Sequence, residues 1–340
     1  MQENNIQEIQ LKIREKAAFI APLRTEMGRV IAGQQELVDR LIMALICGGH
    51  VLIEGVPGLA KTLAVKTLAD CVSGSFARLQ FTPDLLPADL TGTRVYNAET
   101  HDFSTRLGPV FANIVLADEI NRAPAKVQSA LLECMQEHQI TISGETHKLP
   151  EPFMVMATQN PIEQEGTYPL PEAQVDRFMM KLRIGYPERA DERLVLDRMA
   201  HPTPHVSAMK VASLDDIAAA REAMDLVYMD EKITEYILDI VNATRPGRRT
   251  ELSDRQSEAK LDDVQSLIEY GASPRSGIAL ALAAKTLAFM SGRAYVVPQD
   301  IKSVAADVLR HRLTLSYEAE AEDLSADDLI LRLLNELRTP

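Results

Sequence analysis

The chain has 340 residues, of which 46% are hydrophobic and 25% charged, as in a globular protein long enough for two domains. Its 36 Lys and Arg against 49 Asp and Glu give a net charge of −13, which argues against general binding to nucleic acid or anionic membranes. No export signal or bilayer-spanning apolar run is present, and three scattered cysteines fit reduced thiols. We therefore expect a cytoplasmic protein without membrane insertion.

The first 71 residues predict two helices, a strand and a third helix. Apolar residues recur at helical spacing over 6–30 and over 35–47, and two glycines end the second pattern. The short apolar run Val51–Ile53 predicts a buried strand, and a helical pattern extends from the following turn to about Cys71.

The turn between this strand and helix has the composition of a phosphate-binding loop. Its backbone N–H groups and the helix dipole favour an anion, Lys61 can reach terminal phosphates, and Thr62 can hold Mg²⁺. Ala60 stands where the usual G-x-x-x-x-G-K-[ST] pattern has its last glycine, which weakens the match. The predicted nucleotide-binding residues of the loop are Gly55, Val56, Pro57, Gly58, Leu59, Ala60, Lys61, Thr62 and Leu63.

Further strands and two hairpins are predicted up to residue 188. The strand patterns lie at 76–81, 113–117, 153–157 and 178–184. A helix that begins near Pro124 separates two of them, so we expect a parallel α/β sheet. Segments that alternate in polarity predict one hairpin from Thr93–Asn97 and Phe103–Leu107, and another over 139–149. A surface hairpin without function is an equally good interpretation of the first.

After Pro187 the strand patterns end and helical patterns fill the rest of the chain. The helices are expected at 189–200, 214–228, 230–243, 274–291, 298–313 and 325–337. Pro202, Pro204 and the charged run Arg245–Asp263 are predicted loops, and the role of the charged run stays open. The predicted organisation is an α/β nucleotide-binding domain at 1–188, which includes the N-terminal helix and both hairpins, and an all-α domain at 189–340.

Polar residues stand at the ends of the predicted strands, where ligands gather in a parallel sheet. Asp118 and Glu119 end one strand, Asn160 follows the next, and Arg177 precedes the last. Each has an ordinary interpretation as a helix cap, a turn residue or a surface ion pair. Together they suit hydrolysis of a nucleoside triphosphate. Asp118 would join Thr62 in holding Mg²⁺, Glu119 would orient or activate water, and Asn160 would hold that water or the γ-phosphate.

Six blocks of sequence, in this order, resemble the MoxR family of AAA+ ATPases. They are GVPGLAKT at 55–62, FTPDLLP at 81–87, LADEINRAP at 116–124, ATQNP at 157–161, LPEAQVDRF at 170–178 and GASPRS at 271–276. With the C-terminal helices, the resemblance covers the chain from about residue 25. It implies an AAA+ P-loop core, with a parallel five-stranded sheet between helices, and an all-α lid domain. The family's loop also has alanine at position 60, which implies that the loop avoids a left-handed conformation there.

The resemblance also implies roles by position. Asp118 and Glu119 would form the Walker B motif, Asn160 sensor 1, Arg177 the arginine finger and Arg275 sensor 2. Arg177 would act on ATP bound to the neighbouring subunit, so the active form would be a ring, expected to be a hexamer.

Three features are left more open by the resemblance. Arg122 could also face a neighbouring subunit, and the sequence ranks it below Arg177 only by motif position. The hairpins near 92–108 and 139–149 resemble insertions that point toward the ring pore. Residues 31–33 lie where family members contact adenine.

The implied function is ATP hydrolysis coupled to the remodelling or maturation of protein complexes, with ATP and Mg²⁺ as cofactors and a von Willebrand factor A domain protein as partner. The alternatives are a nucleic-acid motor, a chelatase-like motor subunit and a nucleotide-binding scaffold without turnover. The net charge and the absence of Trp weigh against the first of these. The intact set of site residues weighs against the last.

Overall fold

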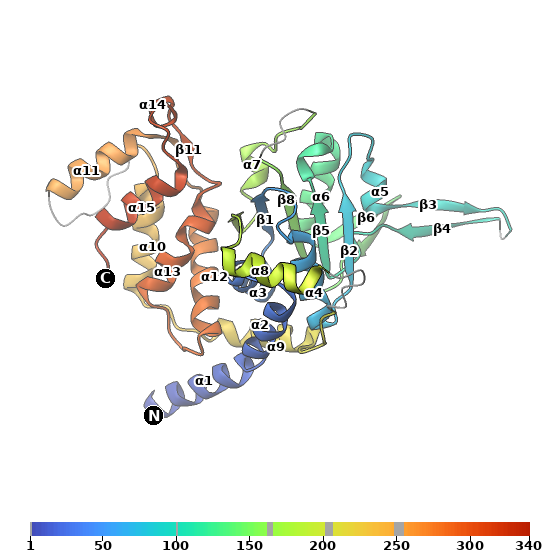
Figure 1. Ribbon diagram of the computed structural model, residues 1–340, viewed down its shortest axis with the longest axis horizontal. Helices are drawn as coiled ribbons and strands as arrows, with labels where there is room; N and C mark the ends of the chain where they lie inside the picture. The colour runs from blue at the N-terminus through green and yellow to red at the C-terminus, as the bar shows by residue number, and fades with distance from the viewer. Residues whose placement is uncertain (1, 100, 162–165, 201–206, 248–254) are drawn as a thin grey trace. The chain divides into compact units, whose positions relative to one another are not determined.

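The computed structural model describes residues 2–99, 101–161, 166–200, 207–247 and 255–340 (Figure 1). Pro202, Pro204 and part of the run Arg245–Asp263 lie outside these ranges. The chain forms two compact units. The sheet unit consists of Phe19–Phe178 and Leu182–Ala218, and the helical unit of Met1–Ala18, Met179–Lys181 and Ala219–Pro340.

A parallel five-stranded sheet with the order β2-β5-β8-β1-β9 forms the core of the nucleotide-binding fold, as predicted. Its strands are β1 (Val51–Gly55), β2 (Phe76–Gln80), β5 (Ile114–Asp118), β8 (Met154–Gln159) and β9 (Met180–Ile184). Every residue of β5, and all but the last of β8, is buried. Such near-continuous apolar strands are typical of a sheet that helices cover on both faces.

The helices of the sheet unit follow the predicted order, with one break and several short additions. They are α2 (Ile20–Val30), α3 (Gln35–Cys47), α4 (Lys61–Val72), α5 (Pro87–Thr91), the 3₁₀ helix η1 (Ile120–Arg122), α6 (Ala125–Glu137), α7 (Glu172–Val175) and α8 (Arg189–Met199). α9 (Leu214–Asp225) crosses into the second unit along the chain.

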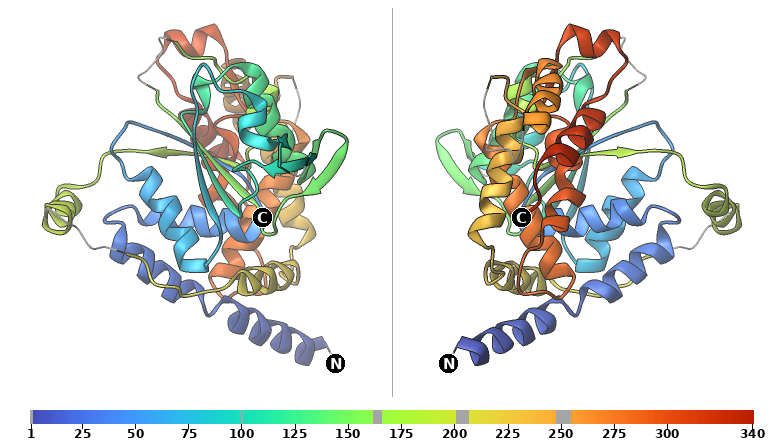
Figure 2. Two further views of the ribbon diagram at one scale, coloured as in Figure 1. Left: turned by 90° about the vertical axis from the view of Figure 1, so that its right-hand side faces the viewer. Right: turned by 90° about the vertical axis from the view of Figure 1, so that its left-hand side faces the viewer.

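The prediction of a single helix over 6–30 was wrong, because this segment forms two helices. They are α1 (Gln2–Ala17), which is the dark-blue helix at the end marked N in Figure 2, and α2. Pro22 explains the break, because a proline has no N–H to donate to the carbonyl four residues earlier and fits only the first turn of a helix. The chain therefore leaves α1 at Ala18 and starts a new helix at Ile20.

Both predicted hairpins are present. β3 (Gly92–Asn97) pairs with β4 (Asp102–Leu107), and β6 (Gln139–Ile142) pairs with β7 (Glu145–Lys148), in antiparallel register. Figure 1 shows β3 and β4 extending well beyond the other elements of the sheet unit.

The first two residues of β9, Met180 and Lys181, group with the helical unit. Its elements are α1, α10 (Glu231–Ala243), α11 (Arg255–Ser266), α12 (Pro274–Met290), α13 (Pro298–Leu309), α14 (Tyr317–Ala321), α15 (Ala326–Glu336) and a small antiparallel sheet of β10 (Ile268–Tyr270) and β11 (Thr314–Leu315). The loop predicted over Arg245–Asp263 was wrong from Arg255 onward. Leu261 and Val264 are buried at helical spacing, and α11 packs against α15.

The division into domains at residues 188 and 189 stays a prediction. The two compact units differ from it in two places, since Met1–Ala18 groups with the C-terminal helices and the segment 189–218 groups with the sheet. No helix in the described part of the chain is long and apolar enough to cross a membrane.

His50, immediately before β1, ties the sheet to α6. Its Nδ1 accepts a hydrogen bond from the Val155 backbone N–H at 3.0 Å, so its Nε2 carries the proton and donates to the Met135 carbonyl, also at 3.0 Å. Burial lowers the pKa of His50 to about 4, against an ordinary value of 6.5, and the nearby His138 adds to this effect. The fold therefore requires a neutral imidazole at this position.

Acid should destabilise the fold through His50. Between pH 6.5 and about 4 the unfolded chain binds a proton at this residue and the folded chain does not, so the free energy of unfolding falls as the pH falls through that window. The shift corresponds to a loss of about 3 kcal/mol at most. Urea unfolding at pH 7 and pH 4.5, with His50→Gln as a non-titrating control, measures it. An equal loss in both proteins would show that other groups cause the acid sensitivity.

Candidate nucleotide-binding site

The predicted phosphate-binding loop joins β1 to α4, which starts at Lys61. Gly58 adopts a φ of +87°, and no atom lies within 4 Å of the position that a Cβ would take. Gly55 has a different function, because a Cβ there would come within 3.0 Å of the Ile184 carbonyl oxygen of β9. One glycine therefore shapes an open loop, and the other allows β1 and β9 to approach closely.

Ala60 adopts a left-handed conformation, with φ 55° and ψ 19°. The expectation that the loop avoids this conformation was therefore wrong. The residue ends the turn directly before α4, and its carbonyl already accepts a helical hydrogen bond from the Ala64 N–H at 2.9 Å. A left-handed alanine costs about 1–2 kcal/mol, and strain of this size persists where the surrounding fold holds the backbone in place.

Lys61 is the cation of the loop. Its Nζ donates a hydrogen bond to the Gly55 carbonyl across the turn. Burial lowers the pKa of Lys61, while the negative charges of Asp118 and Glu119 oppose that shift. The ammonium group thus lies within a loop that partly desolvates it, close to the two predicted carboxylates.

Asp118, at the end of β5, is held from two neighbouring strands. Its Oδ1 accepts a hydrogen bond from the Thr158 hydroxyl of β8 at 2.7 Å. Its Oδ2 accepts from Arg78 of β2, at 2.7 Å from Nη2 and 3.1 Å from Nε. Sequence reasoning missed both partners. The strand pairing could have indicated Arg78. Gln80, the last residue of β2, lies opposite Asp118, and Arg78 is two residues before Gln80.

Glu119 also has a left-handed backbone, with φ 57°. Its N–H donates to the Thr158 hydroxyl at 2.8 Å, so one threonine contacts both carboxylate residues. The Glu119 Oε2 accepts a hydrogen bond from Gln80 Nε2 at 2.9 Å and pairs with Arg122 Nε at 3.1 Å. The carboxylate is therefore oriented by Gln80 and Arg122, and Gln80 is a further site residue that the sequence did not reveal.

A mostly apolar pocket of about 690 Å³ lies beside the loop, a volume that suits a nucleotide. Of the predicted adenine contacts at 31–33, Ile31 and Ala32 line it and Gly33 does not. Further lining residues that the sequence did not indicate are Tyr186, Pro187, Val195 and Leu196. Leu196 is 65% exposed and offers an apolar surface to the face of a nucleobase. The loop, the carboxylates and this pocket together fit a nucleoside triphosphate with its metal ion.

Comparisons with known proteins agree with this geometry. A model of the ATPase family associated with various cellular activities (AAA) matches residues 50–180, and an AAA lid domain model matches residues 261–333. The chain is 48% identical to Chaperone MoxR1 of Mycobacterium tuberculosis over 315 residues, which are 93% of this chain and 81% of MoxR1. The chain belongs to the MoxR family of AAA+ ATPases.

Two further proteins match over nearly the whole chain. YeaC of Bacillus subtilis is 43% identical over 92% of this chain and 92% of its own length. A crystal structure from Cytophaga hutchinsonii superposes with a TM-score of 0.88 at 47% identity, over 100% of this chain and 99% of that one. Nucleotide binding and an ATPase core followed by a lid are therefore features of this chain.

The remaining predicted residues of this MoxR-family chain lie in different places. Asn160 is buried directly after β8, between the strand ends of β5 and β1 in sheet order. Arg177 lies in a separate polar pocket of about 520 Å³ that Glu133 and Glu137 also line, and its Nη1 donates to the Leu132 carbonyl at 2.9 Å. Arg275 lies in the first turn of α12, in the helical unit.

Replacing Ala60 by glycine should stabilise the nucleotide-free protein. Relief of about 1–2 kcal/mol of backbone strain is partly offset by about 0.4–1 kcal/mol of extra chain entropy in the unfolded state. We expect the free energy of unfolding to rise by about 0.5–1 kcal/mol for Ala60→Gly, measured by urea denaturation. Ala60→Val, which adds a branched Cβ at the same backbone angles, is the matched control and should be less stable than the parent. A less stable Ala60→Gly protein would contradict the assignment of strain.

Proposed function

We propose that this chain is a ring-forming ATPase whose catalytic sites are completed by the neighbouring subunit. The observation that carries the proposal is the position of Arg177. Its pocket and the nucleotide pocket have no lining residue in common within the described part of the chain. Arg122, the other candidate, is already paired with Glu119 of its own chain at 3.1 Å. This favours Arg177 as the arginine that reaches ATP in the next subunit, in a ring for which a hexamer is the expected size.

The loop and the strand ends supply the groups that ATP and Mg²⁺ require. Lys61 would exchange the Gly55 carbonyl for a phosphate oxygen. Thr62 and Asp118 offer the oxygen ligands that Mg²⁺ prefers, and the ion when bound would neutralise phosphate charge. Arg78 already donates to Asp118 Oδ2, so a metal ion held by Asp118 would share that oxygen with Arg78 or displace the arginine from it.

Glu119 is the proposed group that orients or activates water. Gln80 and Arg122 hold the same oxygen, Oε2, which fixes the direction of the carboxylate. Asn160 would act as sensor 1 beside the γ-phosphate, and Arg275 of the lid as sensor 2. Arg177 of the neighbour would stabilise the charge that develops in the transition state.

The proposed use of this hydrolysis is the remodelling or maturation of protein complexes. The name of one relative, Chaperone MoxR1, supports a chaperone role. The exposed hairpin β3–β4 supports contact with a client. Tyr96 and Phe103 face each other across its strands, with ring centroids 5.1 Å apart, and are 50% and 54% exposed. The Arg94 guanidinium lies 5.4 Å from the Phe103 ring centre. We propose a von Willebrand factor A domain protein as partner and a cytoplasmic location.

Arg177→Ala should lower kcat for ATP by about 10³-fold or more while nucleotide binding persists, because the finger acts only on the transition state. Arg122→Ala, which removes a contact to Glu119 within the chain, is the matched control and should cause a smaller loss. Turnover is measured above and below the concentration at which the protein oligomerises. An Arg177→Ala protein as fast as the parent would show that the trans assignment is wrong.

A Glu119→Gln protein should bind ATP without turnover and retain its client. Adding Tyr96→Ser and Phe103→Ser should release the client, since these replacements remove the exposed aromatic surface of the hairpin. Tyr317→Ser in the Glu119→Gln background is the control, because Tyr317 is 87% exposed but lies in the helical unit. Retention by both combinations, measured by pull-down and mass spectrometry, would exclude the hairpin as the client contact.

A further inference from the structure

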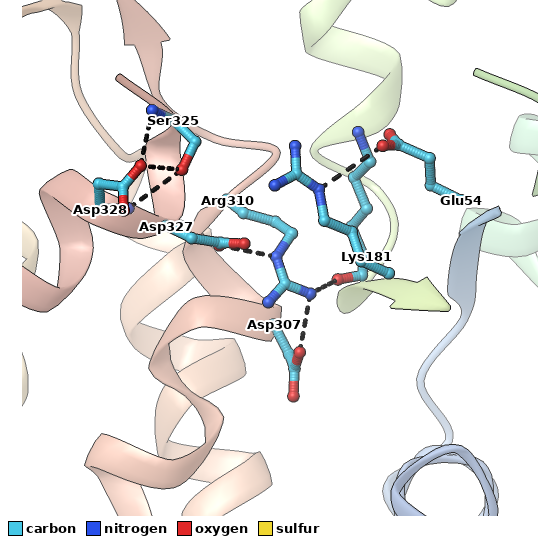
Figure 3. A network of polar contacts seen from close by, with 8 residues as sticks. Glu54, Lys181, Asp307, Arg310, Ser325, Asp327 and Asp328 are labelled. Carbon is cyan, nitrogen blue, oxygen red and sulfur yellow. Dashed lines mark hydrogen bonds and ion pairs between the residues drawn. The ribbon is translucent and has the colours of Figure 1, made fainter. Parts of the chain in front are cut away.

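Strand β9 lies at the edge of the five-stranded sheet, and two arginines of the helical unit hold its backbone. Arg310 Nη1 donates to the Lys181 carbonyl at 2.6 Å, and Arg312 Nη1 donates to the Met179 carbonyl at 3.1 Å. Lys181 is the second residue of β9, and Met179 directly precedes the strand. An edge strand normally leaves such groups unpaired. Figure 3 shows Arg310 between Lys181 and two aspartates.

The guanidinium of Arg310 is locked in place by two helices. It pairs with Asp307 of α13 at 2.8 Å and with Asp327 of α15 at 2.9 Å. The side chains of Arg310 and Asp307 are 11% and 9% exposed. Asp327 lies in the first turn of α15, whose start is fixed by a reciprocal cap between Ser325 and Asp328 (Figure 3). The position of the Lys181 carbonyl therefore depends on how α13 and α15 are packed.

The same strand reaches the catalytic groups at both of its ends. Arg177 lies three residues before β9, and between them the buried Phe178 is fixed in the core of the sheet unit. At the other end, Arg183 pairs with Glu54 of β1 at 3.5 Å, and the Ile184 carbonyl packs against Gly55 of the phosphate-binding loop. Met179–Lys181 groups with the helical unit and the rest of β9 with the sheet unit. One continuous strand is thus part of both units.

We propose that Arg310 and Arg312 are positioning residues for the arginine finger. By fixing the carbonyls of Met179 and Lys181 they set the path of the chain on one side of Phe178. Phe178 is fixed in the core, so a shift of the backbone at Met179 would pivot the chain about Phe178. The direction of the Arg177 side chain, which precedes Phe178, would then change. The lid of one subunit would in this way control hydrolysis in the neighbour's site. The inference rests on the proposed trans role of Arg177.

A subunit-mixing experiment separates finger donation from every other effect. Acceptor subunits carry Arg177→Ala, so they keep Glu119 in their own site but supply no arginine finger to the neighbouring subunit. Donor subunits carry Glu119→Gln, so they give a finger but do not turn over ATP. Mixed rings then hydrolyse ATP only in acceptor sites that a donor finger completes.

We expect the Glu119→Gln donor to restore turnover in mixed rings. With a donor that also carries Arg312→Ala, the restored kcat should be about 10²-fold lower, because misplacing a catalytic group by about 1 Å usually has this effect. The effect should fall on kcat, with KM for ATP unchanged. Arg312→Lys, which keeps a donor for the Met179 carbonyl, should recover part of the loss. Arg332→Ala, on the exposed side of α15, is the matched control and should leave donation unchanged.

Two measurements on the full-length donors test the mechanism without turnover. Binding of a fluorescent ATP analogue should be the same with and without Arg312→Ala. Amide hydrogen exchange over residues 179–184 should be faster in the variant, as the strand loses its anchor. Arg310→Ala removes the guanidinium that pairs with Asp307 and Asp327, so it is used only if its circular dichroism and Tm show a folded protein.

The outcomes are distinct. Failure of the Glu119→Gln donor to restore any turnover would overturn the trans role of Arg177, and with it this inference. Full restoration by the Arg312→Ala donor would overturn the positioning role alone. Weakened ATP binding by that donor, with normal finger donation, would assign the two arginines to the phosphate-binding loop of their own chain and would equally overturn the proposal.

Discussion

The parallel pairing of β5, β8 and β1 is the constraint on which the site depends. Strands that run in the same direction end at one edge, so a carboxylate, an asparagine and a phosphate-binding loop from distant parts of the sequence become neighbours. Thr158 strengthens this arrangement, because its hydroxyl donates to the Asp118 side chain and accepts from the Glu119 N–H. A single buried hydroxyl therefore contacts both the Asp118 carboxylate and the Glu119 backbone.

Charge balance is the second requirement of that edge. Asp118 and Glu119 lie close to each other and are partly removed from water, which is costly for unpaired carboxylates. Arg78 pairs with Asp118, and Arg122 pairs with Glu119. Lys61 interacts electrostatically with both carboxylates, which raises its pKa against the effect of burial. The nucleotide-binding edge is thus an ion-pair network in which each carboxylate has a cationic partner.

The edge strand β9 connects this network to the rest of the molecule. One end packs against the start of the phosphate-binding loop, and the other follows the proposed finger. The carbonyls of Met179 and Lys181, at the start of the strand, accept hydrogen bonds from Arg312 and Arg310. Arg310 is in turn paired with aspartates of α13 and α15. In the proposed ring, a strand held in this way offers a physical route from the lid to the proposed finger.

The sequence by itself determined the sheet, the loop and the predicted residues at the strand ends. Short apolar runs followed by glycine or acidic residues are patterns of neighbouring residues, so they can be recognised from the sequence alone. Only the tertiary structure decided the partners, because Arg78 and Gln80 meet Asp118 and Glu119 across strand pairs about 40 residues apart. It also decided the backbone of Ala60. The fold holds Ala60 left-handed at the junction of the loop and α4, where its carbonyl accepts a helical hydrogen bond, against the preference of the residue itself.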